Sequence, residues 1–146
     1  MANALYDVAR KMLLDAQLMW SNSTDLRCCL VEQGVSPLLT SSTASIADIP
    51  QTQRSYGSGT DPHQGVALTN ITSTNEGAAD ADDVTFTSVS GNTIGAVVIY
   101  KFTVASPESQ NPMVLWLDTA TGLPITPNGG DIIVTWDNGV NKIFRP

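Results

Sequence analysis

Charged side chains are scarce in this sequence, and basic ones are the scarcest. Only 14% of the 146 residues are charged, and 14 acidic residues against 7 basic ones give a formal net charge of −7. The basic residues are scattered, and only Arg10 and Lys11 are adjacent. Binding to nucleic acid or to an anionic membrane depends on clustered Lys and Arg side chains. The composition therefore argues against both as partners.

Long apolar runs are also missing. No stretch approaches the about 18 consecutive apolar residues that indicate a membrane-spanning helix. The N-terminal segment MANALYDVARKMLLDAQLMW mixes acidic and basic residues into its apolar positions, which is unlike a signal peptide. We therefore expect a protein that is synthesised in a cytoplasm and stays soluble.

The side chains that most often carry chemistry are few and isolated. His63 is the only histidine and lies in the turn-like stretch TDPHQG, so we expect a loop role for it. Cys28 and Cys29 are the only cysteines, and neighbours on an extended strand point to opposite faces, which predicts two buried free thiols. Neither G-x-S-x-G nor G-x-G-x-x-G occurs. The sequence predicts no enzyme and no cofactor.

One acidic cluster leaves a metal site open. Asp80, Asp82 and Asp83 follow Glu76 in EGAADADDVTF, and carboxylates that alternate in a loop can bind Ca²⁺. The spacing does not fit an EF-hand, because the glycine at its sixth position and the glutamate at its twelfth are missing. A solvated loop that leads into the following strand is the favoured interpretation, and calcium is the alternative.

Length and hydrophobic content indicate one globular domain that spans residues 1–146. The hydrophobic share is 42%, and a chain of this size buries roughly 68–70% of its unfolded surface without needing disulfides or metal. Residues 1–20 are predicted to form a helix with Asn3 as its N-cap. Its apolar residues recur at steps of three and four: Leu5, Val8, Ala9, Met12, Leu13, Ala16 and Met19.

The rest of the chain is predicted to be mainly β. Residues 25–32, 65–73 and 83–90 read as strands, and residues 95–104 and 112–118 are apolar at successive positions, as in central strands that are covered on both faces. Trp116 and Trp136 are expected in the core. Residues 131–136 and 141–144 flank Asn138-Gly139, the strongest hairpin signal in the chain. The predicted fold is α+β: an N-terminal helix against an antiparallel sheet or β-sandwich of six to seven strands, formed by residues 61–146 with strand 25–32.

Three blocks of sequence carry a resemblance: MANALYDVARKMLL, ADADDVTFTSVSGNTIGAVVIYK and LDTATGLPITPNGGDIIVTWDNGVNKIFRP. In these blocks the chain resembles a family of small virion structural proteins of tailed bacteriophages and prophages, which are similar to capsid decoration (cement) proteins. The resemblance covers the N-terminal helix and most of residues 79–146, whereas residues 33–75 match poorly. It implies no catalytic residues.

The resemblance implies a protein on the outer surface of a virion. Its partner would be the major capsid protein, whose subunit contacts it would stabilise, and the protein would form a homo-oligomer, most simply a dimer. Another virion component, such as a tail, connector or fibre protein, is the first alternative. An enzyme or a sugar-binding β-sandwich is the second, and it would need an exposed aromatic, for instance Trp20 or Tyr56, beside Asp61.

Residues 33–60 are the predicted contact arm. This stretch is rich in Ser, Thr, Gly and Pro, with a short helical turn expected around SIADIP after a Ser45 cap, and loops of this length are commonly functional. We expect the arm to order on contact and to act together with the helix, whose stripe otherwise packs against the protein's own sheet. The candidate contact residues are Val35, Leu38, Leu39, Ile46, Ile49 and Tyr56 of the arm and Leu5 and Met12 of the helix.

Overall fold

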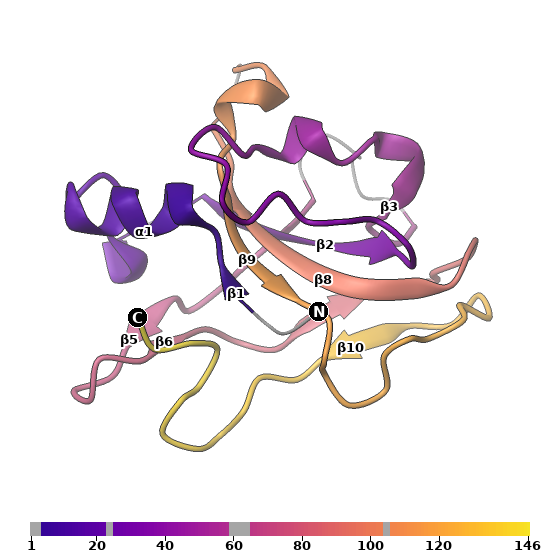
Figure 1. The fold of residues 1–146 in the computed structure, drawn as a ribbon. Coiled ribbons are helices and arrows are strands. Elements are labelled where there is room, and N and C mark those ends of the chain that lie inside the picture. The colour runs from indigo at the N-terminus through magenta and orange to yellow at the C-terminus, as the bar shows by residue number, and fades with distance from the viewer. Residues whose placement is uncertain (1–3, 23–24, 59–64, 104–105) are drawn as a thin grey trace.

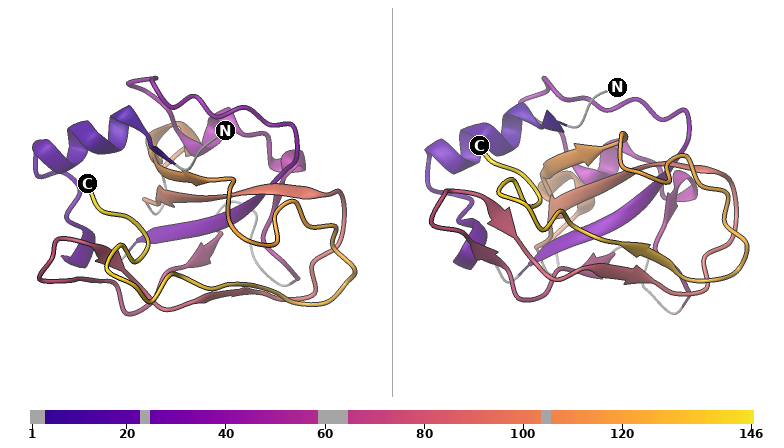
Figure 2. Two further views of the ribbon diagram at one scale, coloured as in Figure 1. Left: turned by 60° about the horizontal axis from the view of Figure 1, so that its bottom comes forward. Right: turned by 90° about the horizontal axis from the view of Figure 1, so that it is seen from below.

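A six-stranded antiparallel sheet forms the middle of three layers in the computed structural model, which describes residues 4–22, 25–58, 65–103 and 106–146 (Figures 1 and 2). The prediction of a mainly β protein with one N-terminal helix is confirmed. The helices are α1 (Asp7–Leu14) and the short 3₁₀ segments η1 (Trp20–Asn22), η2 (Ile46–Asp48), η3 (Gln51–Gln53) and η4 (Glu108–Gln110). The strands are β1 (Ala4–Leu5), β2 (Leu26–Glu32), β3 (Arg54–Ser55), β4 (Val66–Ala67), β5 (Thr72–Ser73), β6 (Ala79–Asp80), β7 (Val84–Phe86), β8 (Ile94–Lys101), β9 (Met113–Leu117) and β10 (Ile132–Val134).

The central sheet is built on the strands with the most continuous apolar sequence. Its order is β1-β9-β8-β2-β3, and β4 also pairs with β2. Most residues of β2, β8 and β9 are buried regardless of the face to which they point. The two predicted central strands and the predicted strand at 25–32 are therefore confirmed. Cys28 and Cys29 are both fully buried and free, as expected.

The two outer layers cover opposite faces of this sheet. Residues 33–58, with η2 and η3, cover one face together with α1, and the lower layer in Figure 1 carries the paired strands β7–β10 and β5–β6. Residues 33–58 do not stand away from the domain as an arm, because Ile46, Ile49 and Tyr56 are buried in the core. The expected helical turn is present as η2, with Ser45 as its N-cap and the Ser45 amide donating to the Asp48 carboxylate over 2.9 Å.

The N-terminal helix is shorter than the predicted span of residues 1–20. Residues 4–5 form β1 instead and pair with β9, and Tyr6 occupies the N-cap position; Asn3 lies outside the described residues. The helix ends in a Schellman motif, in which the Gln17 amide donates to the Met12 carbonyl and the Ala16 amide to the Leu13 carbonyl. Ala16 adopts φ 56°, which turns the chain out of the helix despite the continuing apolar spacing.

Ala16 provides the first test of the structure. A left-handed conformation costs a residue with a Cβ atom about 1–2 kcal/mol, whereas glycine adopts it freely. Glycine also loses more backbone entropy on folding, so we expect Ala16→Gly to raise the free energy of unfolding by about 0.5–1 kcal/mol. Urea denaturation measures this change, and Ala9→Gly in the middle of α1 is the control that should destabilise. Destabilisation by Ala16→Gly would contradict the left-handed assignment.

The hairpin predicted at Asn138-Gly139 is wrong. β10 pairs with β7, with Ile132 opposite Phe86, and residues 141–144 form no strand. Phe144 bridges Ala79 instead, and the amides of Ala79 and Ile143 donate to the carbonyls of Phe144 and Ala79 over 2.8 and 2.9 Å. The Phe144 ring also meets Trp20 edge to face, with 5.1 Å between centroids. These distant partners outweigh the local turn signal.

The predicted strands at 65–73 and 83–90 are interrupted rather than continuous. Asn70 has φ 49° and separates β4 from β5, and Ser88 has the same φ shortly after the end of β7. Positive φ breaks the pleat, since a strand requires extended backbone at each position. Alternation of apolar and hydroxyl side chains therefore located these strands but did not reveal their breaks.

Candidate functional site: an apolar cleft walled by the C-terminal segment

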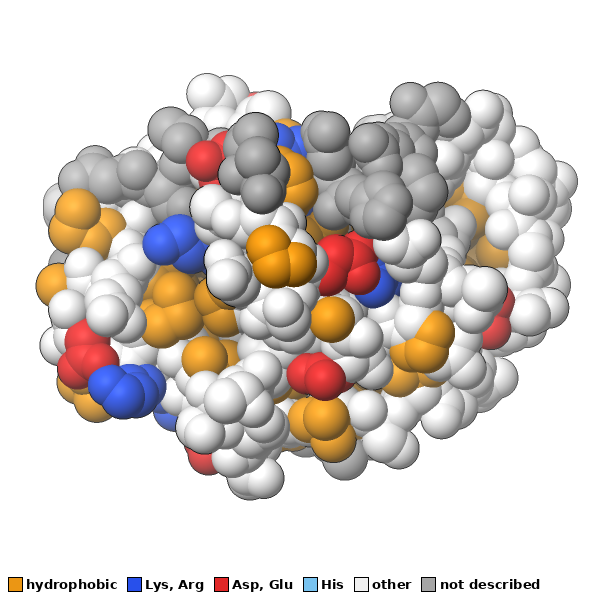
Figure 3. Space-filling model, turned by 90° about the horizontal axis from the view of Figure 1, so that it is seen from above, with side chains coloured by type: hydrophobic (Ala, Val, Ile, Leu, Met, Phe, Trp, Pro, Cys, Tyr) orange, Lys and Arg blue, Asp and Glu red, His pale blue; other side chains and the backbone are white. Residues whose placement is uncertain are grey.

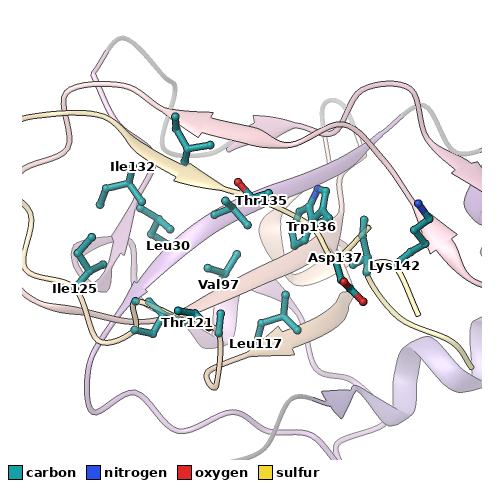
Figure 4. A pocket seen from close by; sticks show the side chains of 16 residues that line it. Leu30, Val97, Leu117, Thr121, Ile125, Ile132, Thr135, Trp136, Asp137 and Lys142 are labelled. Carbon is teal, nitrogen blue, oxygen red and sulfur yellow. The ribbon is translucent and has the colours of Figure 1, made fainter. Parts of the chain in front are cut away.

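A cleft of about 500 Å³ lies between the central sheet and the C-terminal segment, residues 120–143. Its floor is a row of three side chains on neighbouring strands, because Leu30 pairs with Val97 and Val97 pairs with Leu117 in the antiparallel register. Residues directly opposite each other in such a register project from the same face of the sheet. Figure 4 shows the three side chains beneath the segment that carries Ile132 and Trp136.

The walls of the cleft are apolar and are held in place by backbone hydrogen bonds. Ile94 and Ile125 exchange both amide-to-carbonyl bonds, over 2.8 and 2.9 Å, and fix the loop after β9 to the start of β8. The Gly129 amide donates to the Val89 carbonyl over 2.8 Å, which fixes the position of the chain that leads into β10. The apolar residues on these walls are Ala120, Leu123, Ile125, Ile132, Ile133, Val134, Trp136 and Ile143.

Trp136 joins the C-terminal segment to the acidic loop. Its indole Nε1 donates to the Asp82 carbonyl over 2.8 Å, and its backbone amide donates to Asp83 Oδ1 over 3.0 Å. The ring itself is buried, as predicted, and so is that of Trp116. Both polar ends of Trp136 are thereby satisfied while its ring forms part of the cleft wall.

The acidic loop has structural partners that point in different directions. Asp82 accepts hydrogen bonds from Thr69 and Asn70, whereas Asp80 lies 3.6 Å from the Lys142 ammonium and Asp83 caps the Trp136 amide. Across the described ranges, no group of three or more His, Cys, Asp or Glu side chains is placed to hold a metal ion. The three carboxylates thus fasten neighbouring segments together.

Charge is almost missing from the cleft. Among the described residues that line it, Asp137 and Lys142 are the only ionisable ones, and the other polar side chains are Thr121 and Thr135. A nucleophile with an adjacent base, the arrangement needed for covalent catalysis, is not among these residues. Ile133 and Val140 of the same C-terminal segment are 62% and 65% exposed. Apolar walls with exposed apolar residues beside them suit the burial of another molecule's apolar side chains.

A buried polar cluster on the other face of the sheet fastens residues 49–56 to η4. The Arg54 guanidinium, with 1% of its side chain exposed, donates to both Glu108 oxygens over 2.9 and 2.8 Å. It also donates to the Ile49 carbonyl over 2.6 Å and to the Tyr56 hydroxyl over 3.1 Å. Burial raises the pKa of the neighbouring Cys29 thiol to about 12, an effect that Arg54 and the Tyr56 hydrogen bond partly offset. Cys29 is therefore protonated at neutral pH and is not a nucleophile.

The structure does not gather the predicted contact residues into one exposed surface. Leu5, Ile46, Ile49 and Tyr56 are buried in the core, Met12, Val35 and Leu39 are partly buried against it, and Leu38 is 51% exposed. Figure 3 looks down on this face and shows its apolar side chains in small separate groups. Trp20 is also buried, so neither it nor Tyr56 offers the aromatic platform of a sugar-binding site. His63 and Asp61 lie outside the described residues.

The cleft was not predicted from the sequence. Its sequence signal is the alternation in DIIVTW, where Ile132, Val134 and Trp136 share one face of an extended segment. That pattern identifies a half-buried strand but not its partner. The floor of the cleft comes from three strands, of which β2 lies far from β8 and β9 in the chain, and the sheet register places their three side chains side by side.

No protein-family model matches the chain, and no curated protein sequence matches it. Within the part of the chain that the structure describes, no helix has the length and apolar character needed to cross a lipid bilayer.

Proposed function

We propose that this protein is a capsid decoration (cement) protein that binds the outer surface of a tailed-phage capsid and stabilises the contacts between major capsid protein subunits. One observation carries the proposal. The C-terminal segment, which lies in one of the blocks that carry the resemblance to virion structural proteins, forms the wall of an apolar cleft in which no nucleophile has an adjacent base. Its apolar walls, with exposed apolar residues beside them, can bury apolar side chains of another protein.

Charge supports a place on the outside of the shell. A packaged genome is a dense polyanion, and a chain with a net charge of −7 is repelled from it, whereas the outer face carries no such penalty. Low overall charge also suits a protein interface, whose buried centre is depleted of charged residues. Both properties follow from the composition and do not depend on the identity of the capsid.

Mass action explains how such a protein strengthens a shell. Binding to assembled subunits but not to separated ones stabilises the assembly by the free energy of binding. Because a symmetric lattice offers many equivalent sites, the binding free energy of each single contact can be small. Symmetric sites also favour self-association of the bound protein, most simply as a dimer.

Exposed residues at the cleft allow a direct test with purified protein and undecorated capsids. We expect Ile133→Glu to weaken capsid binding at least about tenfold, because a buried apolar anchor at an interface is worth 1.4 kcal/mol or more. Leu14→Glu is the matched control: Leu14 is 87% exposed at the end of α1 and does not line the cleft. Co-sedimentation measures binding, and circular dichroism checks that both variants are folded.

Copy number and position separate the proposal from its alternatives. Hundreds of copies on the outer shell fit a decoration protein, whereas a handful at one vertex or along the tail fit a connector, tail or fibre protein. Protein density on the inner, genome-facing surface would overturn the proposal. If Ile133→Glu and Leu14→Glu bound capsids with the same affinity, the cleft would not be the contact surface.

A further inference from the structure

The C-terminal segment contains two Asn-Gly dipeptides, which are the sequences most prone to deamidation because glycine does not shield its own amide nitrogen. They are Asn128-Gly129 and Asn138-Gly139, and all four residues are exposed. In this reaction the glycine nitrogen attacks the Cγ atom of the asparagine side chain. Sequence and exposure therefore mark both sites as reactive, and the hydrogen bonds around each site decide which one reacts faster.

Asn128 is held in an unreactive arrangement. Its side-chain Oδ1 accepts a hydrogen bond from the Gly130 amide over 2.9 Å. The Gly129 amide, which would have to attack, donates to the Val89 carbonyl over 2.8 Å. A main-chain carbonyl is too weak a base to take the amide proton. Both hydrogen bonds must break before the nitrogen can reach Cγ of Asn128.

Asn138 has the opposite arrangement. The Gly139 amide donates to Asp137 Oδ1 over 3.0 Å, so its proton already points at a carboxylate. No hydrogen bond to the described residues restrains the Asn138 side-chain amide. A Cβ atom at residue 139 would lie 2.9 Å from Asp137 Oδ2, so any other residue there would require the carboxylate to shift. The side chain of Asn138 is thus free to turn toward a nitrogen whose proton has an acceptor.

We propose that Asn138 is a site of spontaneous deamidation and that the Asp137 carboxylate is the base. The Gly139 nitrogen forms a bond to Cγ of Asn138 as its proton passes to Asp137. The tetrahedral intermediate then loses the side-chain nitrogen as ammonia, taking up a proton, and leaves a succinimide ring. Water opens the ring at either carbonyl, giving aspartate or isoaspartate. The net change is Asn and water to Asp and ammonia, with no oxidant or reductant.

The position gives the modification a structural consequence. Asp137 lines the cleft, so the product places a second carboxylate beside the first and adds one negative charge to a chain whose net charge is −7. Isoaspartate also moves one methylene group from the side chain into the backbone. Both products alter the rim of the cleft while leaving its apolar floor unchanged.

The test uses the folded full-length protein, incubated at mildly alkaline pH and sampled over days. Trypsin releases residues 102–142 as one peptide that contains both asparagines, and deamidation raises its mass by about 1 Da. Fragment ions then assign the change to residue 128 or 138. We expect Asn138 to react at least about tenfold faster than Asn128, since two hydrogen bonds restrain the latter.

Two further samples isolate the cause. In concentrated urea the difference between the two sites should shrink, because the hydrogen bonds that restrain Asn128 are lost while Asp137 still precedes Asn138. In Asp137→Ser the reaction at Asn138 should slow several-fold and become more steeply dependent on hydroxide, as expected when an internal base is lost. Equal rates in the folded protein, or a faster reaction at Asn128, would overturn the proposed site. An unchanged rate and pH profile in Asp137→Ser would overturn the role of Asp137.

Discussion

Replacing Glu108 with glutamine is expected to lower the free energy of unfolding by about 3 kcal/mol, because the buried Arg54 guanidinium then has no counter-charge. Glu108 accepts two short hydrogen bonds from Arg54, and almost none of the Arg54 side chain reaches solvent. The glutamine oxygen retains one of these bonds, which keeps the loss at the lower end of the range for broken buried ion pairs. Urea denaturation followed by circular dichroism measures the change.

A double variant separates the charge effect from the loss of packing. Arg54→Met combined with Glu108→Leu removes both charges, and we expect it to be more stable than Glu108→Gln alone, since apolar pairs often replace buried ion pairs at little cost. Hydrogen exchange in Glu108→Gln should show the earliest opening in residues 46–56, which the pair fastens to η4. A loss below about 1 kcal/mol in the single variant would indicate that solvent reaches Arg54.

Replacing Trp136 with alanine is expected to cost about 3–5 kcal/mol, as for other large aromatic residues removed from a core. The substitution removes a buried ring between β10 and the acidic loop and leaves the Asp82 carbonyl without its indole donor. Because Trp136 holds the C-terminal segment against the domain, the effect should reach beyond the local cavity. Thermal unfolding of the variant gives the loss.

Trp136→Phe is the matched control. It retains most of the ring volume but loses the Nε1 donor, so we expect a cost of about 1–2 kcal/mol from the unsatisfied carbonyl. The backbone bond from the Trp136 amide to Asp83 is unaffected by either change. If alanine cost no more than phenylalanine, the C-terminal segment would not be part of the folded core.

Local sequence patterns specified the central elements because those elements are buried on both faces. The predicted strands at 25–32, 95–104 and 112–118 match β2, β8 and β9, most of whose residues are buried. The adjacent cysteines on β2 likewise lie on opposite sides of a buried strand and remain free. In these cases hydrophobic burial and backbone preference agree, so the pattern alone is sufficient.

Elements whose conformation depends on distant residues were not predicted. The Asn138-Gly139 turn signal is strong, but Phe144 bridges Ala79 in place of the expected partner strand and packs against Trp20. The apolar spacing that continued through Ala16 gave no sign that the helix ends there. Residues 33–60 were predicted to form an arm, but Arg54 in this stretch forms a buried ion pair with Glu108. Because Glu108 lies 54 residues away in the sequence, no local pattern indicates this contact.

The sequence by itself determined the chemistry that this protein lacks, its acidic and weakly charged character, and the strands at its centre. These are properties of composition and short-range periodicity, which each segment carries wherever it lies. Only the tertiary structure decided that Leu30, Val97 and Leu117 form the floor of a cleft under β10. It also decided that the Gly129 amide donates to the carbonyl of the distant Val89, which restrains one of the two Asn-Gly pairs. Such relations depend on the register of strands and the contacts of turns, which the fold fixes only after distant segments have met.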